Sequence, residues 1–407
     1  MSHFAPTDLH ELRDAIGEAL AVEEPLEVVA GGSKRGLGRP LQLPRTLDLS
    51  SLAGIRDYQP SELVLSTGAA TPIEEVDAVL AQAGQMLAFE PPDFGALYGL
   101  PASIAGRRTL GGAIACNLSG PRRIKTGAAR DHFLGFRAVS GRGEVFKAGG
   151  KVVKNVTGYD LCKLLAGSWG TLGIMTDITL KVLPQPEAEA TLVLYGLNER
   201  EAGEAMTKAM GSPYDVSGAA HLPDYLAARL DGVGRSDAAT LLRIEGIKPS
   251  VAPRIEGLER ALRPIRAMAK LDERVSRPLW RAIRDARPLA ADTEVGARPL
   301  WRISTAPGQG CEIAARISPA SQLFFDWAGG LVWVAPPAAP DCGAAAIRHA
   351  VAEAGGHATL VRGPAAARAS VDVFEPAGKA LAGLTKRVKE SFDPKGVLNP
   401  GRMWAGV

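Results

Sequence analysis

The chain has 407 residues, of which 46% are hydrophobic and 22% are charged, and such a composition is typical of globular proteins rather than disordered ones. This length exceeds what one hydrophobic core usually supports, so we expect two or three domains. The 47 basic and 44 acidic residues are mixed along the chain and leave a net charge of +3, so the sequence offers no compact basic arm for nucleic acid.

Several other classes of site find no support in the sequence. The four cysteines stand alone, without a CxxC pair or a neighbouring histidine, so we expect free thiols and no metal or iron–sulphur site in this chain. No GxSxG elbow is present, which leaves acyl transfer unsupported. No basic and apolar leader opens the sequence and no apolar run reaches the length of a bilayer span, so we expect a cytoplasmic protein without a transmembrane segment.

The first part of the chain alternates between helix and strand. The elements predicted there from apolar spacing are a helix over 8–20, strands over 26–30, 46–49 and 63–67, and a helix over 72–84. Thr71 is the expected N-cap of the last helix, with Pro72 at its first position. Strand–helix alternation of this kind predicts an α/β arrangement.

Small residues and glycines mark the stretch that follows. The segment 109–117 (TLGGAIACN) allows close packing, runs over 133–139 and 144–147 predict a hairpin, and period-two alternation predicts a strand over 174–182. Within the segment 151–184, four glycines fall within sixteen residues, namely Gly158, Gly167, Gly170 and Gly173. Because glycine weakens any helix or strand, this density predicts a backbone that closely approaches a bulky group, and we expect that group to be a cofactor.

The composition changes at residues 184–186 (PQP), where we expect a domain boundary. The elements predicted beyond it are strands over 191–195, 240–245, 300–304, 323–327, 331–334 and 358–362, and helices over 199–210, 251–262 and 342–354. This order is typical of a split βαβ sheet with helices on one face. The stretch from 374 to 407 is expected to add one helix and a tail rich in proline and glycine.

The loop 31–38 (GGSKRGLG) follows a strand and therefore suggests a nucleotide site. It does not match GxGxxG, and it is not the phosphate loop of NTPases, because Leu37 stands where that motif requires lysine. A glycine-rich turn can still bind a diphosphate through successive backbone N–H groups, with Lys34 and Arg35 adding positive charge. An ordinary surface loop with two solvated cations is the alternative.

Four segments taken in order, VVAGGSKRGLG, TLGGAIACNLSGPRR, KNVTGYDLCKLLAGSWGTLGIMTDITLKVLP and FDPKGVLNPGRM, resemble the vanillyl-alcohol oxidase, or PCMH-type, FAD-binding flavoproteins. Within that superfamily the chain is most similar to the FAD-binding subunits of bacterial glycolate oxidases. The resemblance covers about the first 185 residues and the last 20. It implies an α+β protein with a PCMH-type FAD-binding domain over 1–185, made of two α/β subdomains at about 1–55 and 56–185. A ferredoxin-like α+β cap domain over 186–372 and a C-terminal segment over 373–407 that returns to the FAD domain would complete it.

The resemblance also implies the cofactor contacts. By position, the pyrophosphate would be wrapped by Ala30, Gly31, Gly32, Ser33, Lys34, Arg35 and Gly36, and the second side would be lined by Thr109, Gly111, Gly112, Asn117, Ser119 and Gly120. The third segment would contribute Tyr159, Asp160, Lys163, Gly170, Gly173 and Ile174, and the C-terminal segment Asn399. Relatives with covalent flavin often have histidine in the first loop, so Ser33 implies non-covalent FAD. The alternatives are that Asp160 only caps a helix and that Asn399 only forms a turn before Pro400.

The relatives that oxidise D-2-hydroxy acids carry an HxGDGNxH motif in the cap, and this sequence has none; the corresponding stretch reads DWAGGLVW. Oxidation of an α-hydroxy acid needs a base near the hydroxyl and a cation for the carboxylate. His132 and His221 are weak candidates for the base and Arg302 for the cation, since each is more simply a structural group.

The resemblance therefore implies the FAD-binding subunit of a glycolate oxidase complex. Its partners would be a catalytic FAD subunit that oxidises the small 2-hydroxy acid and an iron–sulphur subunit, and the complex could hold the chain at the inner face of the cytoplasmic membrane. A self-sufficient FAD-dependent dehydrogenase and a flavin-less scaffold subunit are the alternatives.

Overall fold

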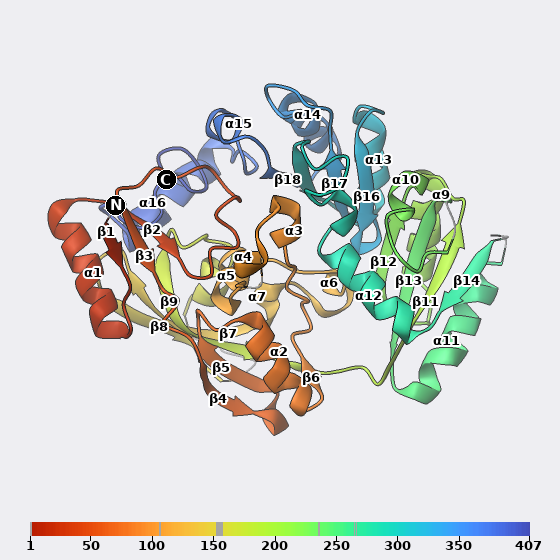
Figure 1. Cartoon of the computed structure of the whole chain (residues 1–407), viewed down its shortest axis with the longest axis horizontal. Coiled ribbons are helices and arrows are strands. Elements are labelled where there is room, and N and C mark those ends of the chain that lie inside the picture. Colours follow the sequence, from red (N-terminus) through yellow and green to blue (C-terminus); the bar gives the residue numbers. More distant parts are fainter. Residues whose placement is uncertain (1, 106, 152–157, 235–236, 264, 266) are drawn as a thin grey trace.

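The computed structural model describes the chain except residues 1, 106, 152–157, 235–236, 264 and 266, so part of the glycine-rich segment 151–184 lies outside the described residues. In Figure 1 the N-terminal and C-terminal parts of the chain form one half of the molecule, and the middle part, centred on a large sheet, forms the other.

The N-terminal unit is a small parallel sheet covered by a helix. Its strands β1 (Ser2–Phe4), β3 (Arg45–Asp48) and β2 (Leu26–Val29) lie in that order. Helix α1 (Leu9–Val22) begins at Asp8, whose side chain accepts from the backbone N–H groups of His10 and Glu11. Its buried face, with Leu12 and Ile16, packs on the sheet beside Leu26.

The second unit is a five-stranded antiparallel sheet. Its order is β4 (Ile55–Gln59), β5 (Val64–Gly68), β9 (Gly173–Lys181), β7 (Phe133–Ser140) and β8 (Val145–Gly149). The helices of this unit are α2 (Ile73–Gln82), α3 (Gly95–Tyr98), α4 (Ala102–Ala105), α5 (Leu110–Ala115), α6 (Arg123–Thr126), α7 (Ala129–His132) and α8 (Leu161–Leu165). The short strands β6 (Gln85–Met86) and β10 (Leu183–Pro184) pair with each other. The prediction that Thr71 caps α2 is wrong, because Pro72 is the N-cap residue. The Thr71 hydroxyl instead accepts a hydrogen bond from the N–H of Gly54 and donates one to the carbonyl of Gly68.

The other half of the molecule is built on an eight-stranded antiparallel sheet that contains two ferredoxin-like βαββαβ units. The first unit comprises β11 (Ala188–Tyr195), α9 (Glu199–Met210), β12 (Val216–Leu222), β13 (Ala239–Gly246), α11 (Lys248–Ala261) and β14 (Met268–Leu271). The second comprises β15 (Leu300–Ser304), α13 (Gly310–Arg316), β16 (Gln322–Asp326), β17 (Leu331–Ala335), α14 (Ala344–Ala354) and β18 (His357–Arg362). The strand order is β14-β11-β13-β12-β16-β17-β15-β18, so the units join between β12 and β16. The sequence predicts a sheet of this type but not its doubling.

The two faces of this sheet bury different partners. Residues such as Leu192 and Ile303 face the four helices of the βαββαβ units. Residues such as Phe324 and Trp333 face α10 (Asp224–Ala227), α12 (Glu273–Arg284) and, from the other half of the molecule, side chains that include Phe94. The second face therefore packs directly on the N-terminal half.

A buried ionic cluster also joins the two halves. Arg122, which precedes α6, forms ion pairs with Glu90 at 2.7 Å and with Glu245 of β13. Arg243 of β13 lies 3.1 Å from Glu90 as well. Each carboxylate is thus shared between guanidinium groups, which offsets the cost of burying these charges.

The C-terminal segment returns to the N-terminal sheet through α15 (Ala365–Ser370) and α16 (Lys379–Phe392). Leu398 forms a parallel bridge with Leu26 of β2. The buried Lys389 donates to Asp393 at 2.6 Å and to the carbonyl oxygens of Thr171 and Leu398 at 2.7 and 2.9 Å. These bonds bring the two ends of the chain together, as Figure 1 shows.

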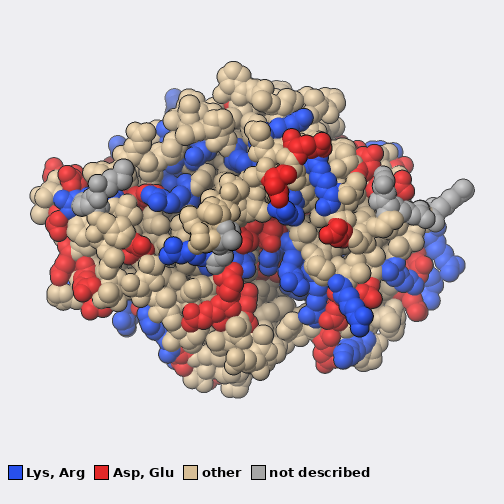
Figure 2. All heavy atoms as spheres, in the orientation of Figure 1, with Lys and Arg blue, Asp and Glu red and all other residues tan. Residues whose placement is uncertain are grey.

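Figure 2 shows basic and acidic side chains interspersed over the visible face, in keeping with the mixed charge of the sequence. Among the described residues, no helix has both the length and the apolar character that crossing a membrane would require.

Candidate cofactor-binding site

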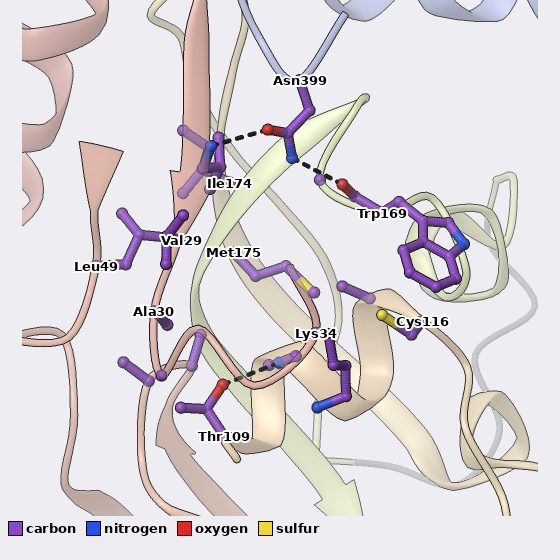
Figure 3. A pocket seen from close by; sticks show the side chains of 18 of the residues that line it. Val29, Ala30, Lys34, Leu49, Thr109, Cys116, Trp169, Ile174, Met175 and Asn399 are labelled. Atoms are coloured by element: carbon purple, nitrogen blue, oxygen red, sulfur yellow. Dashed lines mark hydrogen bonds between the residues drawn. The ribbon is translucent and has the colours of Figure 1, made fainter. Parts of the chain in front are cut away.

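A cavity lies where the three-stranded sheet, the five-stranded sheet and the C-terminal segment meet. Figure 3 shows side chains from all three parts around it. Of the residues expected to contact a cofactor, those that line the cavity are Ala30, Gly31, Gly32, Ser33, Lys34, Arg35, Thr109, Gly111, Gly112, Gly170, Gly173, Ile174 and Asn399. Other lining residues include Leu49, Cys116, Trp169, Met175 and Arg402.

The loop after β2 presents free backbone donors. The N–H groups of Gly31, Gly32, Ser33 and Lys34 have no hydrogen-bond acceptor among the described residues. Successive N–H groups in a glycine-rich turn form a concave site for anions, and a diphosphate fits such a site. Gly31 is required by the fold as well, since a Cβ atom there would lie 1.5 Å from the carbonyl oxygen of Arg107.

The wall at α5 contributes space rather than donors. The N–H groups of Leu110 and Gly111 already donate to Thr71 and Ala69, and that of Gly112 donates to the Thr109 hydroxyl at 3.2 Å. A Cβ atom on Gly112 would meet only the Thr109 hydroxyl at 3.1 Å and the Lys34 ammonium at 3.6 Å, so the missing side chain leaves cavity volume free. Backbone N–H groups are therefore free in the first loop but not at the start of this helix.

Two cations at the cavity lack an acidic partner among the described residues. The Lys34 ammonium has one polar contact, the Ser33 hydroxyl at 3.5 Å, and burial lowers its pKa. The buried Arg402 donates to the Lys34 carbonyl at 2.9 Å, also without an ion pair. Cys116 cannot neutralise them, because burial raises the pKa of its thiol to about 11. Unpaired buried charge is costly, so this cavity is built for an anion. Arg35 differs, since it forms an ion pair with Glu27.

Arg402 was missed by the sequence analysis. It belongs to LNPGRM, the segment in which only Asn399 was singled out, and its contact with Lys34 joins residues 368 positions apart. Trp169 was missed as well, and its left-handed backbone (φ 57°) gave no sequence signal, because such a conformation is uncommon for tryptophan.

Asn399 lies in the cavity wall, but its side-chain amide is occupied. Its Oδ1 accepts from the N–H of Val28 at 2.8 Å, and its Nδ2 donates to the carbonyl of Trp169 at 2.9 Å (Figure 3). The amide thus holds β2 and the Trp169 loop at a fixed separation. Asn399 positions the wall and leaves neither amide group for a ligand.

Seven expected contacts lie outside the cavity, namely Gly36, Asn117, Ser119, Gly120, Tyr159, Asp160 and Lys163. Tyr159 is 94% exposed, and Asp160 caps α8 by accepting from the N–H of Lys163 at 3.1 Å. Asn117 and Ser119 accept from backbone N–H groups of α7, and Gly120 accepts from the Trp327 indole. Apart from Gly36 and Tyr159, these residues have structural partners, although they flank the segments that line the cavity.

The two histidines considered as possible bases make hydrogen bonds within the protein framework. His221 is buried in β12 against the Thr240 hydroxyl at 2.9 Å, and burial lowers its pKa to about 4. His132 lies 3.0 Å from the carbonyl of Thr126 in the N-terminal half. Neither residue lines the cavity. Within the described part of the chain, no group of three or more His, Cys, Asp or Glu is arranged to bind a metal ion.

Comparisons with known proteins agree with this geometry. Residues 3–149 match the model of the FAD binding domain family. The chain is 33% identical to glycolate oxidase subunit GlcE of Escherichia coli K12 over 394 residues, 97% of each chain. It is 42% identical to glycolate oxidase subunit GlcD of Bacillus subtilis over 105 residues, which are 26% of this chain and 21% of GlcD.

Solved structures confirm the predicted PCMH-type α+β fold. The 4-ethylphenol oxidase from Gulosibacter chungangensis superposes with a TM-score of 0.70 and 15% identity, over 99% of this chain and 89% of that protein. p-Cresol methylhydroxylase superposes with a TM-score of 0.69 and 14% identity, over 98% and 88%.

Proposed function

The chain belongs to the family of FAD-binding oxidoreductase subunits that includes glycolate oxidase subunit GlcE, and from this premise we propose that it is the FAD-binding subunit of a glycolate oxidase complex. The complex would oxidise glycolate, or a related 2-hydroxy acid, to the 2-oxo acid. The observation that carries the proposal is the GlcE match over 97% of both chains, because it includes the middle of the chain and the C-terminal segment, not only the cofactor domain. For the domain limits we propose 1–185, 186–372 and 373–407.

The residues of the cavity fit FAD. We propose that the free N–H groups of Gly31–Lys34, with Lys34 and Arg402, hold its diphosphate, while Gly112 and the wall fixed by Asn399 provide room for its rings. Bound FAD supplies two-electron redox chemistry. Ser33 replaces the histidine that covalent flavoproteins often carry in this loop, so we propose non-covalent binding. The contacts predicted at Gly36, Asn117, Ser119, Gly120, Tyr159, Asp160 and Lys163 stay predictions.

The division of labour within the complex is also part of the proposal. GlcD of Bacillus subtilis is also named as a glycolate oxidase subunit and resembles this chain over 105 residues, so we propose that a related FAD subunit is the partner that oxidises the substrate. We further propose an iron–sulphur subunit as the next electron carrier and, through the complex, a place at the inner face of the cytoplasmic membrane.

A self-sufficient 2-hydroxy acid dehydrogenase is the second candidate. It would need a base beside the substrate hydroxyl. His221 is buried on Thr240 with a pKa lowered to about 4, and His132 is bonded to the backbone of Thr126. These contacts favour the subunit over the self-sufficient enzyme.

The test compares the chain alone with the chain co-purified with its candidate partners. Flavin content and glycolate-dependent dye reduction are measured for both. We expect bound FAD in both and turnover only in the complex. Turnover by the chain alone would establish the self-sufficient enzyme, and absence of flavin from a folded chain would establish a scaffold subunit.

A further inference from the structure

Two arginines at the junction between the halves of the molecule share one tryptophan ring. Arg302 lies on β15, and its guanidinium carbon is 4.7 Å from the centre of the Trp327 ring. Arg123 is the first residue of α6, in the FAD-binding half, and its guanidinium carbon is 4.4 Å from the same centre. Figure 1 places α6 at the boundary with the eight-stranded sheet. The pair therefore brings two positive charges together across the junction.

The ring itself is held firmly. Trp327 is 4% exposed, and its indole N–H donates to the carbonyl of Gly120 at 2.9 Å. Its backbone N–H donates to the buried carboxyl of Asp326 at 2.7 Å. The arginines are thus arranged on a fixed platform, and this limits the entropy lost when they bind a ligand.

Neither guanidinium has a hydrogen bond or an ion pair among the described residues. This is unusual beside the interior arginines of the same junction, since Arg122 and Arg243 are both paired with Glu90. Asp326 acts electrostatically on Arg302 and Asp131 on Arg123, but neither carboxyl forms an ion pair with these arginines, and burial raises the pKa of the Asp326 carboxyl to about 7. The two arginines are therefore left without an ion-paired carboxylate among the described residues.

Both arginines are half-buried, so solvent still reaches part of each side chain. Burial and the neighbouring Arg123 charge lower the pKa of Arg302 to about 10, as expected for a cation that lies deep without a counter-ion.

We propose that Arg123 and Arg302, stacked on Trp327, form a binding site for a small carboxylate anion that bridges the FAD-binding half and the eight-stranded sheet. Stacking on the indole occupies a guanidinium face and leaves the in-plane N–H edges free. Those edges match the planar, two-oxygen geometry of a carboxylate. None of these three residues lines the cavity at Lys34, and the proposal does not depend on the proposed function.

The test uses the full-length chain with its flavin as purified. Sodium acetate, glycolate and oxalate are titrated calorimetrically against a constant chloride background, and inorganic phosphate is titrated in a parallel arm. We expect at least one carboxylate to bind one-to-one and to raise the melting temperature, since it joins the two halves. Tighter binding of phosphate than of every carboxylate would overturn the assignment of ligand class.

Variants then test the two arginines. Arg302→Lys keeps the positive charge but loses the two parallel N–H donors of the guanidinium, and Arg123→Gln removes one of the two positive charges. We expect each variant to weaken carboxylate binding about 10- to 100-fold. Arg281→Gln, an exposed arginine on α12, is the matched control and should bind as the unmodified chain does. If neither variant changes the affinity, or if no carboxylate binds saturably to the unmodified chain, the arginines only pack Trp327 and the proposal is wrong.

Discussion

Replacing Lys34 by methionine should separate the stability of the chain from its affinity for FAD. Methionine keeps an unbranched side chain of similar length but removes a charge that has no acidic partner in the described part of the chain. A charged hydrogen bond contributes about 1.5–3 kcal/mol, so the loss of contact with the diphosphate should weaken FAD binding about 10- to 150-fold. Since burial disfavours the ammonium, the flavin-free chain should unfold at the same or a higher temperature.

The assay is equilibrium dialysis against FAD, with flavin absorbance as the readout, together with thermal unfolding of the flavin-free chain. Arg35→Gln is the matched control in the same loop, because Arg35 is already paired with Glu27 and should contribute less to FAD binding. Unchanged FAD affinity in Lys34→Met would show that Lys34 does not face the diphosphate. A large loss of stability without flavin would show that the ammonium has a structural partner.

Two further predictions concern Gly112 and Asp326. Gly112→Leu should fill the cavity and abolish FAD retention, while the flavin-free chain still unfolds cooperatively. The control Gly17→Leu, on an open face of α1, should keep its flavin. Full flavin content in Gly112→Leu would place the cofactor elsewhere. The Asp326 carboxyl has a pKa of about 7 in the folded chain and a value near 4 in the unfolded chain. Its protonated form therefore stabilises the fold most below pH 4. Up to roughly 4 kcal/mol of this contribution to the free energy of unfolding is lost as the pH rises from 4 through 7. Melting temperatures from pH 5 to 8 should therefore fall more steeply for the unmodified chain than for Asp326→Asn, and parallel curves would contradict the assignment.

Regular apolar patterns made most of the fold predictable. The strand predicted over 300–304 is β15, Leu300–Ser304, and the helix predicted over 199–210 is α9, Glu199–Met210. Strand β12 escaped prediction because its sequence VSGAAHL is dominated by small residues that show no alternation. Helix α12 escaped because Pro278 lies inside it, and proline normally argues against a helix interior.

The features of the candidate site that are local in the sequence were predictable, and those that depend on contacts between distant segments were not. Glycines and a lysine in the loop 31–36 pointed to the turn that lines the cavity with free backbone N–H groups, since these features are local in the sequence. The joint arrangement of Lys34 and Arg402 could not be predicted, because it depends on how the C-terminal segment returns to β2. The occupied amide of Asn399 is equally non-local, since its partners Val28 and Trp169 come from two distant segments.

The eight-stranded sheet has the plan of a homodimer fused into one chain. Counted inward from either edge, its strands are the fourth, first, third and second of a βαββαβ unit, and the copies meet at one registered pair, His221 with Phe325. Such an internal duplication leaves each copy free to diverge. On the face toward the FAD-binding half, the first copy presents Arg243 on its third strand, whereas the second copy presents Arg302 on its first strand. The two copies thus place the arginines of this face on different strands of the same plan.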